Sequence, residues 1–239
     1  MSTLAPAAGS ATLLARSRRG AIFLAILTPL GPLAMAGWAF AMPYVAWGDI
    51  PQSAAAIVQN PVGAQFGLLF ISLSSVFGAI GALVVGAAVR RGSPRFGAVA
   101  TAMTFTGFIV AAYPGPIAAI AASKAAGLTG DQLLALIAGV DAQVQGIVLG
   151  AAFASLPAGI LLLGIAAVIA SRSGRYTLLS AILLVAAIPV VLVTGMIPGV
   201  SGVALGLGWI FVAVAFAAGG LEFLRPSAAD RRRAGAAPV

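Results

Sequence analysis

The side-chain types that most often perform chemistry in proteins are scarce in this sequence. Its 239 residues include no His and no Cys, and only five residues are acidic. The chain therefore lacks an imidazole base, a thiolate and the usual ligands of zinc or haem. It also lacks the spacing of a nucleophile–base pair or of a phosphate-binding loop. We expect no catalytic residue, no metal and no cofactor, so an intramembrane enzyme is the least favoured class of function.

One pair of polar residues has a spacing that suits a small site. Asp141 and Gln145 are four residues apart, so they share a face if this segment is helical. They stand at the head of a long apolar run, where a membrane helix would meet water. The Ser and Thr residues inside such runs can bond to carbonyls of their own helix, so we expect them to be structural. Asp141 and Gln145 are therefore the candidate polar site.

The composition indicates which elements must position this pair. The sequence is 61% hydrophobic and 8% charged, whereas soluble domains are about 25% charged. An integral membrane protein is predicted, and helices are the elements that satisfy their own backbone in lipid. A membrane helix needs about 20 apolar residues. Six runs qualify: residues 20–47, 64–89, 96–123, 142–171, 176–197 and 202–224.

The basic residues predict the orientation of these six spans. All of them except Lys124 lie on one side of the spans, and the positive-inside rule places that side and both termini in the cytoplasm. We expect a protein of the bacterial cytoplasmic (inner) membrane. Its parts are a basic tail of residues 1–19, a membrane domain of residues 20–224 and a basic tail of residues 225–239. The residues expected to set the topology are Arg18, Arg19, Arg90, Arg91, Arg95, Arg172, Arg175 and Arg225.

A net charge of +8 raises the question of a nucleic-acid partner. The basic residues form short clusters at the ends of apolar runs, without interleaved aromatic residues or a polar domain, so we reject a nucleic acid. Such clusters attract acidic lipids instead. The stretch RRGSPR at residues 90–95 is accordingly predicted to be a cytoplasmic turn. The expected partners are the lipid bilayer and the acidic lipids at its cytoplasmic face, with a protein partner or a homo-oligomer left open.

Two segments leave alternatives open. Residues 1–36 contain basic residues, an apolar run and the sequence Ala34-Met35-Ala36, as a cleaved signal peptide does. We prefer a first span because the apolar character continues as far as Tyr44. Residues 129–140 are predicted to be helical, with a capping box formed by Thr129 and Gln132. This helix either lies on the outer surface, as a connector or a lid, or extends the fourth span.

Two repeating patterns bear on how the spans pack. The first, third and fifth spans each follow a short segment with Ser and Arg, and each reaches a proline toward its outer end. The predicted fold class is therefore an all-α integral membrane protein of six transmembrane helices, arranged as three helical hairpins with both termini inside. Small residues at every fourth position allow close helix packing, within the chain or in a dimer. These seams are Ser74, Gly78, Ala82 and Gly86; Gly146, Gly150, Ala154 and Ala158; and Gly202 and Gly206.

Prolines interrupt several spans. A proline inside a helix frees the carbonyl four residues earlier, and transporters use such breaks to bind ions or substrates. The sequence TPLGP at residues 28–32 is the most disruptive, because it holds two prolines and a glycine. Pro157 and Pro189 are the other prolines within spans. These residues motivate a transporter as the alternative function.

The stretch GDIPQSAAAIVQNPVGAQFGLLF, followed by a span that ends in arginines, resembles uncharacterised bacterial multi-pass membrane protein families. The resemblance implies no activity and carries over no functional residue. From the residues themselves, we expect a structural, regulatory or partner-binding membrane component without catalytic chemistry. A transporter or permease-like component for a neutral or amphipathic small molecule is the second hypothesis.

Overall fold

The computed structural model describes residues 8–42, 59–111, 127, 131–132, 135, 139, 144–195 and 201–225. These residues are helical apart from short turns, and they contain no strand. The all-helical fold class is thus confirmed for the described part of the chain. Its helices are α1 (Ala8–Leu27), α2 (Leu30–Ala41), α4 (Pro61–Arg90), α5 (Pro94–Ala111), α8 (Val144–Arg172), α9 (Leu178–Gly195) and α10 (Ser201–Phe223).

Five of the described helical segments are long and apolar enough to cross a membrane: Arg18–Ala41, Val62–Arg90, Gly150–Arg172, Leu178–Gly195 and Gly202–Phe223. They support a multi-pass membrane protein. Helix α5 has 18 residues and carries Arg95 at its second position, and it is not one of the five. The third predicted span, residues 96–123, overlaps α5 as far as Ala111, and the rest of that span lies outside the described residues.

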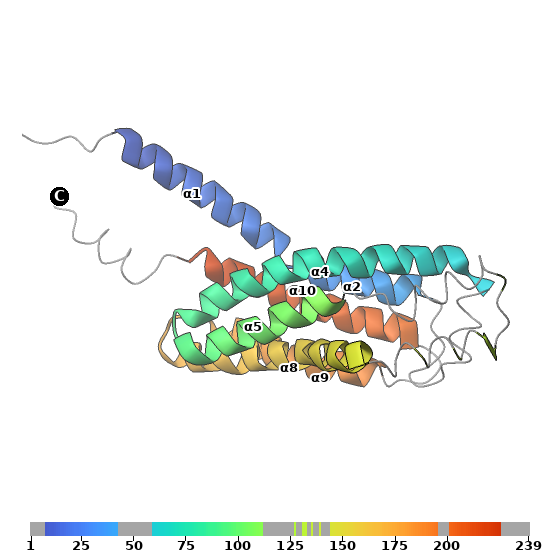
Figure 1. Ribbon diagram of the computed structural model, residues 1–239. Coiled ribbons are helices and arrows are strands. Elements are labelled where there is room, and N and C mark those ends of the chain that lie inside the picture. The colour runs from blue at the N-terminus through green and yellow to red at the C-terminus, as the bar shows by residue number, and fades with distance from the viewer. Residues whose placement is uncertain are drawn as a thin grey trace, which may run out of the picture.

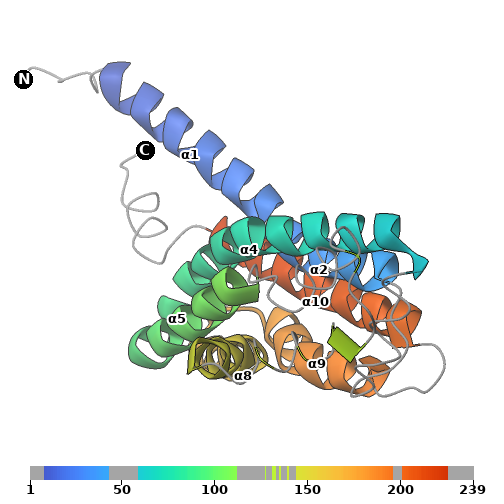
Figure 2. The same ribbon diagram turned by 45° about the vertical axis from the view of Figure 1, so that its right-hand side comes forward.

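The helices pack in the order of the sequence around a closed ring. Helix α2 packs against α4, α4 against α5, α5 against α8, α8 against α9, α9 against α10, and α10 again against α2 (Figures 1 and 2). Helix α10 also packs against α4 across the ring. The two short connections that the structure describes join α4 to α5 and α8 to α9, at the same end of the bundle. The connections that would close the three predicted hairpins lie outside the described residues.

The first predicted span is broken into two helices at Thr28 and Pro29. Pro29 has no backbone N–H, so the carbonyl of Ala25 loses its helical partner. The hydroxyl of Thr28 donates to that carbonyl at 2.6 Å, and the backbone N–H of Thr28 donates to it at 3.3 Å. Helix α1 leaves the bundle at an angle from this point, as both views show (Figures 1 and 2). The helix already begins at Ala8, so part of the basic tail predicted at residues 1–19 is helical.

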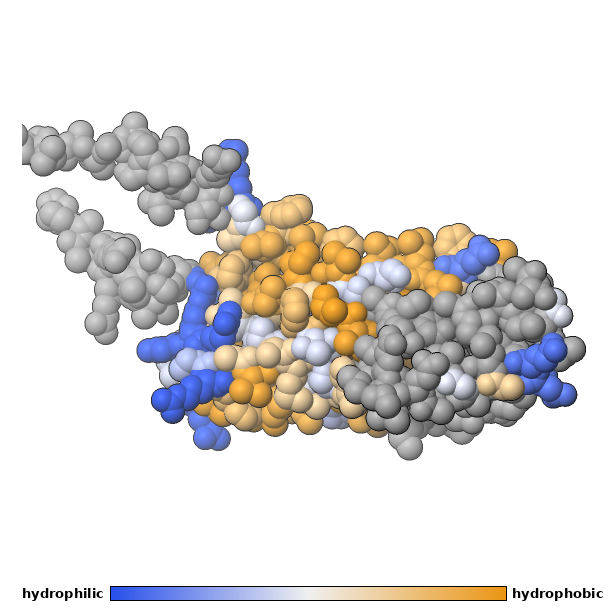
Figure 3. Space-filling model, in the orientation of Figure 1, coloured by the Kyte–Doolittle hydropathy of each residue, from blue (hydrophilic) through white to orange (hydrophobic). Residues whose placement is uncertain are grey.

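The surface of the bundle separates an apolar middle from a charged end. On the face seen in Figure 3, apolar side chains form a broad belt over the helices, and hydrophilic residues gather at the end with the two short turns. Arg90 ends α4, Arg95 is the second residue of α5 and Arg172 ends α8, so these arginines lie at that end. We call this region the basic end; it consists of residues 90–95 and 172–180 and of residues 219–225.

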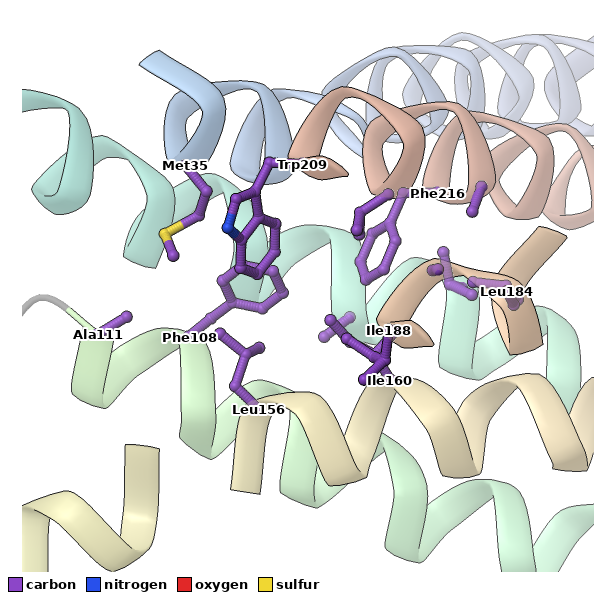
Figure 4. Close-up of a cluster of buried hydrophobic side chains, with 14 of the residues drawn as sticks. Met35, Phe108, Ala111, Leu156, Ile160, Leu184, Ile188, Trp209 and Phe216 are labelled. Atoms are coloured by element: carbon purple, nitrogen blue, oxygen red, sulfur yellow. The ribbon is translucent and has the colours of Figure 1, made fainter. Parts of the chain in front are cut away.

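Large apolar side chains fill the centre of the ring (Figure 4). The rings of Phe108 on α5 and Phe216 on α10 meet edge to face, with their centroids 6.0 Å apart. Leu156 and Ile160 of α8 and Leu184 of α9 surround them and are at most 1% exposed. These buried side chains stabilise the bundle, because the dispersion contacts of their many atoms add up.

Glycines allow backbones to touch where helices cross, and two crossings illustrate this. A Cβ atom built on Gly31 of α2 would overlap the Cα of Gly78 on α4. A Cβ atom on Gly107 of α5 would overlap the backbone of Leu156 on α8. A larger residue at Gly31 or Gly107 would therefore force the helices apart, because backbone atoms cannot give way as a flexible side chain can.

The seam predicted on α4 faces the interior of the bundle. Ser74, Gly78, Ala82 and Gly86 are all buried, and Gly86 lies against the side chain of Thr101 on α5. The seam on α10 faces α2: Gly206 contacts the ring of Phe40, and a Cβ atom on Gly202 would lie 3.1 Å from the carbonyl oxygen of Ala39.

The seam predicted on α8 does not pack against another helix of the chain at the residues that can be compared, and the dimer alternative stays a prediction. A Cβ atom at Gly150 would meet nothing within 4 Å, Ala154 is exposed and Ala158 is only half-buried. The surroundings of Gly146 lie outside the described residues. The packed face of this helix instead carries Leu156, Gly159, Ile160 and Leu163. Ala154 and Leu156 are two residues apart and thus point to opposite sides of a helix.

Candidate functional site at the basic end

Three arginines, one buried carboxylate and several hydroxyl groups join the helices at the basic end. The first arginine is Arg91, which follows α4. Its Nη1 donates to the carbonyl oxygens of Glu222 (3.3 Å) and Arg225 (3.0 Å), and its Nη2 donates to that of Phe223 (2.9 Å). The last carbonyls of a helix have no partner within the helix and carry partial negative charge. Arg91 therefore caps α10 with a side chain from the turn that follows α4.

Aromatic contact adds to this cap. The guanidinium carbon of Arg91 lies 5.7 Å from the centroid of the Phe223 ring, a cation–π distance. Arg175, in the turn between α8 and α9, donates from its Nη1 to the carbonyl oxygen of Arg91 at 2.5 Å. Arg91 thus connects the turn between α8 and α9, through its carbonyl, with the end of α10, through its side chain. Gly174 has a φ of +65°, which only glycine adopts without strain, and it allows the tight turn that presents Arg175.

The acidic member of the site is Glu222, on the last turn of α10. It is only 4% exposed. The hydroxyls of Thr177 and Ser180 both donate to its Oε1, the second at 3.2 Å, and Nη1 of Arg225 lies 3.1 Å from its Oε2. A buried charge is tolerated only where it is paired and hydrogen-bonded. Oε1 meets that condition through the two hydroxyls, and Oε2 has the ion pair with Arg225 but no hydrogen bond among the described residues. The two hydroxyls tie α10 to the start of α9.

Tyr176 completes the buried part of the site. It is 4% exposed, and its hydroxyl packs beside Gly219, where a Cβ atom would come within 3.1 Å of the oxygen. Burial raises the pKa of this phenol well above its ordinary value, and the charge of Glu222 raises it further, against the smaller effect of Arg225. The hydroxyl is therefore protonated at physiological pH. Within the part of the chain that the structure describes, it has no hydrogen-bond partner.

The groups at the basic end hold helices together and give a surface that attracts anions. The guanidinium of Arg91 and the carboxylate of Glu222 are occupied by contacts within the protein. Arg90, Arg95 and Arg172 are exposed and give this end a positive surface. Within the described residues, no group of three His, Cys, Asp or Glu residues could hold a metal ion.

The polar site predicted from the sequence lies elsewhere. Asp141 is outside the described residues, as is the side chain of Gln145, whose backbone belongs to α8. The described residues of the predicted helix at 129–140 are Asp131, Gln132, Ala135 and Gly139; all are helical and exposed. The choice between a surface helix and an extension of the fourth span remains a prediction.

The hydroxyl groups within the spans bond to their own helices, as predicted. The hydroxyls of Ser74, Thr101 and Thr104 donate to the carbonyl oxygens of Ile71, Gly97 and Ala100, respectively. Ser155 of α8 does so too, but it also donates to the carbonyl oxygen of Met103 on α5 at 3.0 Å. Polar side chains therefore contribute little to helix association in the middle of the bundle.

Sequence reasoning assigned only topology to Arg91, Arg175 and Arg225 and gave Glu222 no role. One signal could have found the site: Glu222 is an acid within an apolar run, three residues before an arginine. An acid in that position needs a partner. Thr177 and Ser180 precede it by 45 and 42 residues, so their part depends on the fold.

No protein-family model, no curated protein and no solved structure matches this chain.

Proposed function

We propose that the protein is a six-span component of the bacterial cytoplasmic membrane that acts by binding other membrane components, without catalysis or transport of its own. Helix α5 serves as the third span in this proposal. It has 18 residues, as α9 does, and it packs between α4 and α8. The exposed arginines of the basic end favour the cytoplasm as the location of that end and of both termini.

One observation argues against a transport function. Six large side chains in the centre of the bundle are at most 1% exposed, namely Phe108, Leu156, Ile160, Leu163, Val212 and Phe216. A side chain without accessible surface cannot line a water-filled passage. The hydroxyls of Ser74 and Thr104 donate to backbone carbonyls of their own helices, so they offer little to a polar substrate.

A transporter remains the second candidate because of the break at Thr28 and Pro29. Helices interrupted by proline recur at the binding sites of transporters. A hinge at this break would let α1 move relative to the other helices, and the apolar interior would then suit a neutral or amphipathic molecule.

Water access to single cysteines tests the proposal, because the natural chain has no Cys. Thr104→Cys and Ser155→Cys place thiols in the middle of the bundle, and Asp131→Cys places one at the end opposite the basic end. A membrane-impermeant maleimide is added to intact cells. We expect labelling of Asp131→Cys alone. Labelling of Thr104→Cys would mean that water reaches the centre, and it would replace this proposal with the transporter.

A fourth variant, Ser173→Cys, tests the orientation. Ser173 is exposed in the turn between α8 and α9. We expect its thiol to react only after the cells are permeabilised. Reaction in intact cells would place the basic end outside and would contradict the proposed topology.

A further inference from the structure

We propose that Arg175 and Arg225 bind a phosphate group, and that this phosphate belongs to an acidic phospholipid. Together with Arg91, which positions them, these residues are called the arginine cluster. The inference rests on the membrane location and the orientation proposed above. It adds a particular ligand and a particular place to the general attraction of arginines for acidic lipids.

Hydrogen bonds place the three arginines of the cluster in one patch. Nη1 of Arg175 donates to the carbonyl oxygen of Arg91 at 2.5 Å, and Nη1 of Arg91 donates to the carbonyl oxygen of Arg225 at 3.0 Å. Nη1 of Arg225 donates in turn to the hydroxyl of Thr177 at 2.5 Å, two residues after Arg175. The contacts thus return to the segment where they began, and they bring together guanidinium groups from three distant segments of the chain.

The positive charge of the cluster exceeds the negative charge beside it. Glu222 is the acidic residue that the structure describes at the basic end, and its Oε2 lies 3.1 Å from Nη1 of Arg225. Three guanidinium groups and one carboxylate leave two positive charges unbalanced. Because like charges at short separations repel one another, an anion bound among them would be stabilised.

Arg175 and Arg225 retain donors for such an anion. A guanidinium group carries five N–H donors. Arg175 is exposed and uses Nη1 in its bond to Arg91, and the side chain of Arg225 is 61% exposed and uses Nη1 in both of its contacts. The planar fork of a guanidinium group matches two oxygens of a phosphate. Arg91 is half-buried and already bonds to the end of α10, so its part is to hold the other two in place.

Exposed leucines beside the cluster favour a lipid as the source of the phosphate. Leu178 and Leu179 follow Thr177 directly, and Leu224 stands just before Arg225. Their exposed fractions are 56%, 66% and 36%, respectively. A free phosphate ion would gain nothing from these side chains, whereas a phospholipid can lay its acyl chains against them.

The preference among lipids must come from the headgroup, because lipid tails are as apolar as leucine. A zwitterionic headgroup would bring its own cation to a cluster that already has unbalanced positive charge. An acidic headgroup brings a phosphate without that cation, so it is favoured.

The test measures lipid retention by the full-length protein. The protein is reconstituted with equal amounts of phosphatidylglycerol and phosphatidylcholine, and the lipids that stay bound are counted by native mass spectrometry. Arg175→Gln is compared with Arg172→Gln, which removes the same charge from an exposed residue on the last turn of α8. We expect Arg175→Gln to reduce the preference for phosphatidylglycerol about ten-fold. Arg172→Gln should reduce it about two-fold at most, as for an exposed surface charge.

Two further variants keep the charge and remove only the planar fork. Arg175→Lys and Arg225→Lys should each reduce the preference about three-fold, and Arg225→Lys retains a cation for Glu222, so the fold is preserved. Arg172→Lys is the matched control, and we expect it to leave the preference unchanged. Inorganic phosphate added to the natural protein separates the two sources of phosphate, and we expect bound phosphatidylglycerol to remain.

Equal losses for Arg175→Gln and Arg172→Gln would mean general surface attraction and would overturn the proposal. An unchanged preference in Arg175→Gln, or no preference in the natural protein, would overturn it too. Displacement of phosphatidylglycerol by inorganic phosphate would assign the cluster to the free ion instead of a lipid. The maleimide test at Thr104 is independent of these variants, so failure of the arginine cluster and failure of the proposed function are distinguishable.

Discussion

The basic end and the middle of the bundle hold the same helices together by different means. At the basic end, Arg91, Arg175 and Glu222 make polar contacts from one helix or turn to another. In the middle, apolar side chains and close backbone approach connect the helices, and the one hydroxyl described above that crosses to a neighbour is that of Ser155.

This difference follows from where the backbone stops being helical. Inside a span, each carbonyl is satisfied by its own helix, so a polar side chain between helices gains little. At the basic end, the turns and the last turn of α10 leave carbonyls that need donors. Arginine supplies several donors from one side chain, which suits it to this position. The same residues that are expected to orient the protein therefore also fasten its helices.

The largest effect is expected where two backbones touch in the middle. Gly31→Ala introduces a Cβ atom that would overlap the Cα of Gly78. We therefore expect the free energy of unfolding to fall by about 3 kcal/mol, near the upper end of the range for overpacked cores. The midpoint of thermal unfolding in detergent measures it. Gly150→Ala is the matched control, because a Cβ atom there meets nothing within 4 Å. Its midpoint should rise slightly, since alanine favours a helix by about 1 kcal/mol over glycine. Equal destabilisation of both variants would contradict the described packing.

A smaller loss is expected when the cap of α10 is removed. Arg91→Ala deletes the donors to three carbonyls and the contact with Phe223. We expect a loss of about 2 kcal/mol, as for hydrogen bonds made by a charged group. The same thermal measurement applies, with Arg95→Ala as the control because Arg95 is exposed. If Arg95→Ala were as destabilising as Arg91→Ala, charge and not the cap would be responsible.

A still smaller effect, and one of opposite sign, is expected at Tyr176. Its buried hydroxyl lacks a hydrogen-bond partner among the described residues, and burying an unpaired polar group is unfavourable. Tyr176→Phe should therefore raise the free energy of unfolding by about 1 kcal/mol. A fall would show that the hydroxyl is hydrogen-bonded, for example to an ordered water.

The sequence allowed the apolar helices to be predicted well where a long run begins and ends with turn residues. The span predicted at residues 202–224 is α10 (Ser201–Phe223), and the span predicted at 64–89 lies within α4 (Pro61–Arg90). The proline-rich TPLGP was recognised as disruptive. The departure of α1 from the bundle could not be foreseen, because it depends on the glycines of α4 and α10 that hold Thr28.

Contacts between distant segments limited the prediction of the sites. A small residue at every fourth position indicates that a helix can pack closely, but it does not say which face meets a neighbour; the stripe through Gly150 and Ala154 is on the exposed side. The partners of Glu222 come from α9 and from the turn before it. Neither feature is visible without the arrangement of the helices.

Polar contacts hold the helices together at the basic end, and apolar packing holds them together in the middle. Two nearly isosteric substitutions compare these regions in one thermal unfolding experiment. Glu222→Gln removes the charge that pairs with Arg225, and Thr104→Val removes a hydroxyl bonded within its own helix. We predict a loss of about 2 kcal/mol for Glu222→Gln and of about 0.6 kcal/mol or less for Thr104→Val. If Thr104→Val lowered the free energy of unfolding as much as Glu222→Gln or more, polar contacts would matter in the middle of the bundle as much as at the basic end, and the difference between the two regions would be refuted.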